Sequence, residues 1–204
     1  MRKLFVCAAL ISFVGIAFGG TQAGKSSLAG QVYGSSGTEI AYGKMASSTT
    51  MYLLSFNLNY NSETSEAEFS GKTAEGPKTS GYSINLIPEY RSYLRPDAQV
   101  SPYWGIYALL GMGSSKTEQP DGGTAIASGE TTGSNSIFGA GVTVGAEYFL
   151  NKTISLSANT RLAQISLSTE KSESGTGDAA STSTQKTMAF SLGISAGIYL
   201  RIYF

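Results

Sequence analysis

The chain has 204 residues, a length that favours a single domain. Its 14 basic and 14 acidic residues cancel, so composition gives no sign of the basic surface that binds nucleic acid. Histidine is absent, which excludes imidazole acid–base catalysis, histidine triads and histidine metal ligands, and no cofactor is predicted. Charged residues are only 14% of the chain, against roughly 25% in soluble domains.

The N-terminus has the pattern of an export signal. Arg2 and Lys3 precede an apolar run, Leu4 to Phe18, which is shorter than the roughly 20 residues that a spanning helix needs. Small residues offer cleavage after Gly19 or after Ala23, and the two sites remain alternatives. The predicted organisation is a signal peptide over residues 1–23 and one folded domain over residues 24–204.

Beyond this segment the chain alternates between apolar and small or polar residues, the period of a β-strand. In the C-terminal segment, apolar side chains occupy every second position from Met188 to Phe204. Two shorter segments, Ser27–Gly34 and Glu39–Met45, bring the expected number of strands to eight. The six clear strands are predicted over residues 49–62, 80–94, 101–114, 135–149, 153–168 and 187–204.

Strand length separates a soluble barrel from a membrane barrel. The predicted strands run to about a dozen residues, whereas globular strands usually have 5 or 6 and membrane strands need roughly 9 to 11. Aromatic residues bracket the apolar faces, as Tyr52 and Tyr60 do on one strand and Tyr82 and Tyr90 on the next. The sequence therefore predicts an all-β, antiparallel, up-and-down transmembrane barrel whose outer face contacts outer-membrane lipids.

The connections between strands alternate in length. Residues 95–99 and 150–152 are tight turns, whereas 63–79, 114–134 and 171–185 are predicted as long polar loops on the outer side of the cell. Acidic residues outnumber basic ones there, which predicts an acidic rim. We interpret these charges as residues of solvated loops, and the alternative is a specific ligand or cation site. The rim comprises Glu63, Glu66, Glu68, Glu75, Glu118, Asp121, Glu130, Glu170, Glu173 and Asp178, with Lys72, Lys78, Lys116, Lys171 and Lys186.

Charged residues also fall on the inward faces of the strands, where only paired charges are tolerable. We expect Glu147 and Arg201 to form a contact, with Arg91 as a candidate third member. Such a cluster would fill and fix the interior, and the alternative is a gate or narrow ion path. Within one strand, Pro88 predicts a bulge or an edge-like distortion. The predicted interior cluster is Glu89, Arg91, Glu147, Arg161 and Arg201.

The alternation, the loop asymmetry and the terminal strand together resemble the small eight-stranded outer-membrane barrels of the OmpA and OmpX kind. The resemblance implies residence in the cell outer membrane and contact with its insertion machinery during assembly. It also implies that the terminal strand carries the assembly signal, ending on an aromatic residue. The residues of this implied signal are Ile198, Tyr199, Leu200, Ile202 and Phe204.

No reaction can be read from the sequence. A Gly-x-Ser-x-Gly match at Gly193–Gly197 lies inside a predicted strand without a histidine base, so we interpret it as chance. The leading hypothesis is a non-enzymatic surface protein that supports envelope integrity, adhesion or surface contact through its loops, whose ligand is not indicated. The alternatives are a small passive channel and, less favoured without histidine, a lipid-modifying barrel enzyme.

Overall fold

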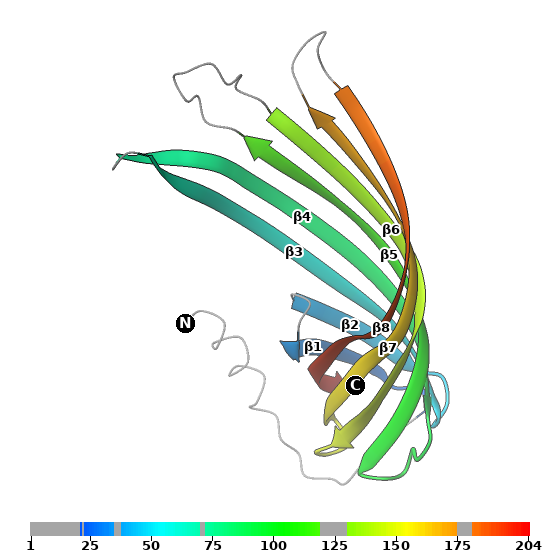
Figure 1. Cartoon of the computed structure of the whole chain (residues 1–204). Helices are drawn as coiled ribbons and strands as arrows, with labels where there is room; N and C mark the ends of the chain where they lie inside the picture. The colour runs from blue at the N-terminus through cyan, green and yellow to red at the C-terminus, as the bar shows by residue number, and fades with distance from the viewer. Residues whose placement is uncertain (1–20, 22, 35–37, 70–71, 119–129, 175–180) are drawn as a thin grey trace.

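The computed structural model describes residues 21, 23–34, 38–69, 72–118, 130–174 and 181–204. They form one closed antiparallel barrel in which each strand pairs with its neighbours in sequence (Figure 1). This confirms the predicted all-β, eight-stranded, up-and-down fold, while the predicted signal peptide lies largely outside the described residues. The strands are β1 (Ser26–Gly34), β2 (Thr38–Met45), β3 (Thr50–Phe69), β4 (Lys72–Tyr93), β5 (Val100–Glu118), β6 (Glu130–Phe149), β7 (Ile154–Ser174) and β8 (Ser181–Tyr203).

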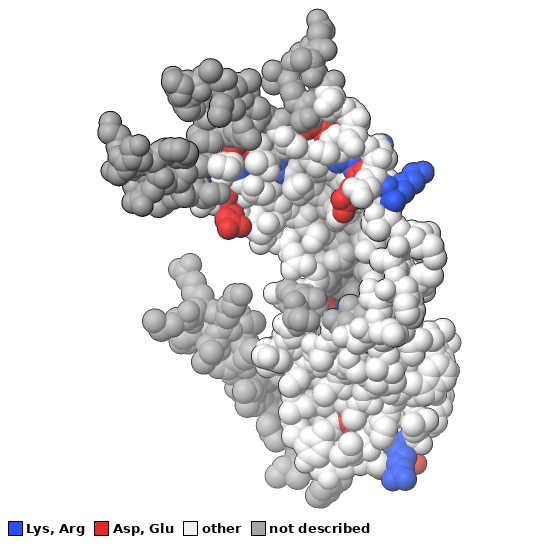
Figure 2. Space-filling view, viewed as in Figure 1, with Lys and Arg blue, Asp and Glu red and all other residues white. Residues whose placement is uncertain are grey.

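Side chains alternate between an apolar outside and a filled inside. On β3, Leu54 and Phe56 are exposed, whereas Leu53 and Ser55 are buried. Apolar residues therefore face outward although exposure to water would be unfavourable, as expected where the surrounding medium is lipid. On the face seen in Figure 2, the outer surface has a broad band without charged residues at the middle of the molecule. No helix in the described part of the chain is long and apolar enough to cross a membrane.

The strands are strongly tilted because the rows of paired residues climb around the barrel. A row that starts at Leu200 of β8 passes through Gly30 and Ile40 and returns to β8 at Met188. The displacement is 12 residues, from 200 to 188. For eight strands at ordinary spacings this gives a tilt of about 46° from the barrel axis. Followed from β1 towards β8, each row therefore rises from the end of the barrel that carries the C-terminus towards the opposite end.

The two ends of the barrel differ. The turn end carries the connections 46–49, 94–99 and 150–153, and the opposite hairpin end carries three long hairpins. The prediction that these hairpins are long loops was wrong, because most of the residues concerned continue as strands. Residues 63–69 pair with residues of 72–79, and the same holds for 114–118 with 130–134 and for 171–174 with 181–184. Backbone hydrogen bonds thus extend the sheet beyond the apolar band.

The wall of the barrel is much shorter at the β1–β2 hairpin. Among the described residues, β3 pairs only with β4 from Asn59 to Phe69. On the other side of the hairpin, β8 pairs only with β7 from Ser181 to Ala196. The upper part of the sheet is consequently open on the side above β1 and β2, and the strands from β3 to β8 form a curved wall there (Figure 1).

Several irregularities interrupt the regular ladders, and two of them involve residues named in the sequence analysis. Around Pro88, β4 and β5 pair at Leu86 with Leu110 and at Glu89 with Tyr107, and no pair lies between. The register does not shift there, so of the two predicted alternatives the structure shows the edge-like distortion and not the bulge: pairing is lost locally beside a residue without an N–H. A true bulge occurs at Gly193, whose φ of 66° is a left-handed conformation suited to glycine.

Candidate functional site

The pair nearest the turn end joins Glu147 of β6 to Arg201 of β8. Their side chains approach to 3.4 Å between Oε1 and Nε, and both are fully buried. The Glu147 carboxylate also accepts hydrogen bonds from the hydroxyls of Tyr93 at 2.6 Å, Tyr203 at 2.7 Å and Ser155. The buried negative charge is therefore satisfied on several sides, as a charge removed from water requires.

Two further ion pairs lie higher in the interior. Arg91 binds Glu89 through two hydrogen bonds of 2.7 and 3.2 Å, and its guanidinium stacks 4.5 Å from the ring of Tyr103. These two residues are two positions apart on β4 and so point to the same side. Arg91 is therefore bound to Glu89, and no ion pair joins it to Glu147 among the described residues.

The third pair contains a residue that the sequence analysis missed. Arg161 binds Glu39 at 3.2 Å, and Tyr199 donates a second hydrogen bond to the same carboxylate oxygen at 3.3 Å. Glu39 belongs to the short strand β2, where Ile40 and Tyr42 point outward and Glu39 inward. The alternation in this segment carried the signal, but the strand was too short for the pattern to stand out.

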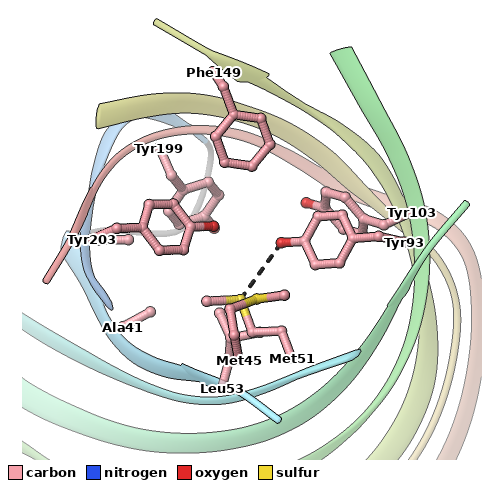
Figure 3. Close-up of a cluster of buried hydrophobic side chains, with 10 residues drawn as sticks. Ala41, Met45, Met51, Leu53, Tyr93, Tyr103, Phe149, Tyr199 and Tyr203 are labelled. Atoms are coloured by element: carbon pink, nitrogen blue, oxygen red, sulfur yellow. Dashed lines mark hydrogen bonds between the residues drawn. The ribbon is translucent and has the colours of Figure 1, made fainter. Parts of the chain in front are cut away.

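Aromatic and methionine side chains fill the space around these pairs. Met45 and Met51 meet near the centre, and the Tyr93 hydroxyl lies 3.5 Å from the Met51 sulfur (Figure 3). Tyr103 and Tyr203 approach the same centre from other strands. We call these side chains and the three ion pairs the plug. The lower interior is packed with side chains, as expected for eight strands.

Above the plug the interior opens into a polar cup. This cavity of about 450 Å³ is lined by residues of the hairpin arms, among them Asn59, Asn61, Ser83, Ser115 and Asn135. Asn59 donates a hydrogen bond of 2.7 Å to Asn57 below it. Amide and hydroxyl groups dominate the lining, which also includes Glu170 and Lys171, so the cup offers hydrogen-bond donors and acceptors together with one charge of each sign.

The family follows from the sequence and the fold together. Residues 8–200 match the outer membrane protein beta-barrel domain family. The chain belongs to this family. This confirms the predicted family and places the protein in the cell outer membrane. No curated protein sequence is similar enough to match.

Two solved outer-membrane proteins share the fold at low sequence identity. A major outer membrane protein from Thermus thermophilus is 13% identical, with 88% of this chain and 98% of that chain covered and a TM-score of 0.52. OprG from Pseudomonas aeruginosa is 10% identical, with 91% and 98% covered and a TM-score of 0.50. In an outer-membrane barrel the short turns face the periplasm, so the turn end is periplasmic and the hairpins are extracellular.

The extracellular rim carries charges of both signs. Lys116 and Glu118 form a pair of 2.9 Å on β5, and the lysine lowers the pKa of the Glu118 carboxyl below its ordinary value. Red and blue side chains gather at this end of the molecule (Figure 2). Asp121 and Asp178 lie outside the described residues. The same holds for the side chains of Glu66, Glu68, Glu75, Glu130 and Lys72, so the predicted acidic rim stays a prediction.

The terminal strand of the outer-membrane barrel has distinct faces. Ile198, Leu200 and Ile202 lie on the outward face, whereas Tyr199 points inward to Glu39. Phe204 follows the end of β8, exchanges two backbone hydrogen bonds of 2.9 Å with Ser26, and is 66% exposed as a residue. The aromatic end is thus available at the periplasmic side, and its recognition by the insertion machinery stays a prediction.

The Gly-x-Ser-x-Gly match and the tight turn at residues 150–152 have structural explanations. Gly193, the first residue of the Gly-x-Ser-x-Gly match, is the bulge residue of β8 and not part of a strand-to-helix turn. Asn151 accepts hydrogen bonds from the backbone N–H groups of Thr153 at 2.7 Å and Ile154 at 2.8 Å, closing the periplasmic turn. No group of three or more potential metal ligands occurs among the residues that the structure describes.

Proposed function

We propose that this protein is a non-enzymatic surface protein of the outer membrane that acts through its extracellular hairpins and does not conduct solutes. The observation that carries the proposal is the plug. Three ion pairs and several buried aromatic side chains occupy the interior between the periplasmic turns and the polar cup. A passive channel would need these groups to move together, at the cost of separating buried charges.

The extracellular half supports a role in contact with other molecules or surfaces. The arms of three hairpins continue as paired strands beyond the apolar band, so they project as a supported sheet. Asn61, Ser115 and Asn135 bring hydrogen-bonding groups from three different strands to the cup. Polar groups held on a rigid scaffold are the usual basis of specific surface binding.

Enzymatic activity is not part of the proposal. A lipid-modifying barrel would need a nucleophile with an adjacent base near the membrane surface. The sequence contains no histidine, so a Ser–His–acid arrangement cannot form. The carboxylates in the interior are bound to arginines and tyrosines, so they take part in structural interactions.

Conductance and adhesion measured on the same protein test the two parts of the proposal. In planar bilayers the refolded wild type should give no single-channel steps. Cells that display the wild type should adhere to a test surface more strongly than cells displaying a variant in which residues 63–79 are replaced by Asn-Gly, which closes β3 directly onto β4. Asp97→Asn, in a periplasmic turn, is the control.

Regular conductance steps from the wild type would refute the sealed interior. Equal adhesion by the wild type and the shortened variant, with both at equal levels in the outer membrane, would refute the contribution of this hairpin. A heat-modifiable gel shift establishes in each case that the barrel is folded.

A further inference from the structure

A groove runs across the lipid-facing surface of β2 to β6, outside the barrel and separate from the cup. It has a volume of about 930 Å³, within the 300–1,000 Å³ that is common for ligand sites. Its floor is formed by Pro88, Ala108 and Ala140, which follow one another on β4, β5 and β6. These residues are small, and the β4–β5 ladder lacks pairs beside Pro88. The small side chains and the missing pairs together leave the outer surface hollow at this point.

Larger side chains border this floor. Tyr52, Tyr90, Ile106 and Val142 form the next row of paired residues towards the periplasm. The ring of Tyr90 packs against Tyr52 at 5.8 Å between centroids, and against Trp104 at 6.1 Å. A continuous aromatic wall therefore supports the periplasmic side of the groove, at the level where aromatic residues favour the membrane interface.

One end of the groove carries a positive charge. Lys44 is paired with Tyr52, points outward and lies next to the periplasmic end of β2. No acidic side chain in the described part of the chain forms an ion pair with it. Glu89 follows Pro88 in the chain, but its carboxylate is turned inward and bound to Arg91. The groove thus combines an unpaired cation with an otherwise apolar lining.

The direction of the groove matches the leaflet it faces. From β2 to β6 it crosses four interstrand spacings, about 19 Å in total. Because the rows climb at about 46° to the membrane plane, the groove rises about 14 Å from Lys44. Half of the hydrocarbon core is about 15 Å. A chain lying in the groove would run from the periplasmic interface to the middle of the membrane.

We propose that this groove binds one anionic phospholipid of the periplasmic leaflet, with the phosphate at Lys44 and an acyl chain along Pro88, Ala108 and Ala140. The charge at the interfacial end selects the headgroup, and the apolar floor accommodates the chain. The site is independent of the surface role proposed above, because none of its residues lines the cup.

Native mass spectrometry of the folded barrel, titrated with phosphatidylglycerol or phosphatidylcholine, tests the proposal. The wild type should retain one phosphatidylglycerol and bind it in preference to phosphatidylcholine. Lys44→Gln should reduce that preference about fivefold, the effect of one basic residue near an anionic lipid surface. The double variant Ala108→Leu with Ala140→Leu fills the floor and should lose retention of both lipids.

Two matched controls separate the groove from general effects. Lys152→Gln removes an exposed lysine from a periplasmic turn, and Ala158→Leu enlarges an outward alanine on β7, away from the groove. Both should retain lipid as the wild type does. Unchanged selectivity in Lys44→Gln, unchanged retention in the filled variant, or a lipid-free dimer in place of a lipid-bound monomer would overturn the proposal. A heat-modifiable gel shift verifies folding of each variant.

Discussion

Replacement of Glu147 by alanine should be among the most destabilising single changes in the barrel. Arg201 would remain fully buried without its partner, and Tyr93 and Tyr203 would lose their shared acceptor. Removing one member of a buried pair costs about 3–5 kcal/mol in the free energy of unfolding. With an m-value of about 2 kcal/mol per molar urea, the unfolding midpoint should fall by about 2 M.

The assay is urea unfolding in phospholipid vesicles, followed by the fluorescence of Trp104, the single tryptophan of the chain. The double variant Glu147→Ala with Arg201→Ala should lose less stability than the two single variants added together, because it leaves no unpaired charge. Glu118→Ala is the control, since its pair with Lys116 is at the exposed rim and should contribute little. A loss below about 1 kcal/mol for Glu147→Ala would refute the assigned role of the pair.

Three further outcomes are expected. Gly145→Ala places a Cβ 2.5 Å from the carbonyl oxygen of Ala158 and should cost about 1–3 kcal/mol in urea unfolding, whereas Gly30→Ala, with open space around its Cβ, should cost much less. Phe204→Ser should lower the amount of protein recovered in outer-membrane fractions while refolding in vitro stays as in the wild type; equal recovery would contradict the assembly role. By NMR titration the Glu118 carboxyl should stay ionised to lower pH than usual, so its pair with Lys116 is lost only as pH falls through the lowered pKa. Lys116→Gln should raise the pKa of Glu118. An unchanged pKa in this variant would exclude the lysine as the cause of the shift.

The membrane-spanning part of the fold was predictable because lipid imposes a strict pattern. Apolar side chains must alternate with interior ones wherever a strand crosses the bilayer, and this locates all eight strands. Above the bilayer both faces of a strand meet water or the polar cup. The arms 63–69 and 72–79 therefore contain polar residues without alternation, and they were interpreted as loop.

The interior was predictable only in part. Counting residues from the turns brought Glu147 and Arg201 to a similar height, and the structure places them in contact. The partner of Arg91 was harder to predict. Glu89 lies two residues away on the same strand, and a partner on another strand was equally compatible with the pattern. The position of Arg161 opposite Glu39 depends on closure of the barrel through the short β1–β2 hairpin, which no local pattern reveals.

Tilt also fixes the width of the barrel. Eight strands inclined at about 46° enclose a lumen with a backbone radius of about 9 Å. A lumen of that radius is filled only where long side chains reach the axis, and the tyrosine and methionine side chains that meet there are of this length (Figure 3). Whether the barrel is open or shut is therefore decided by a few side chains and not by the wall, so this scaffold would carry a pore if those side chains were shortened together.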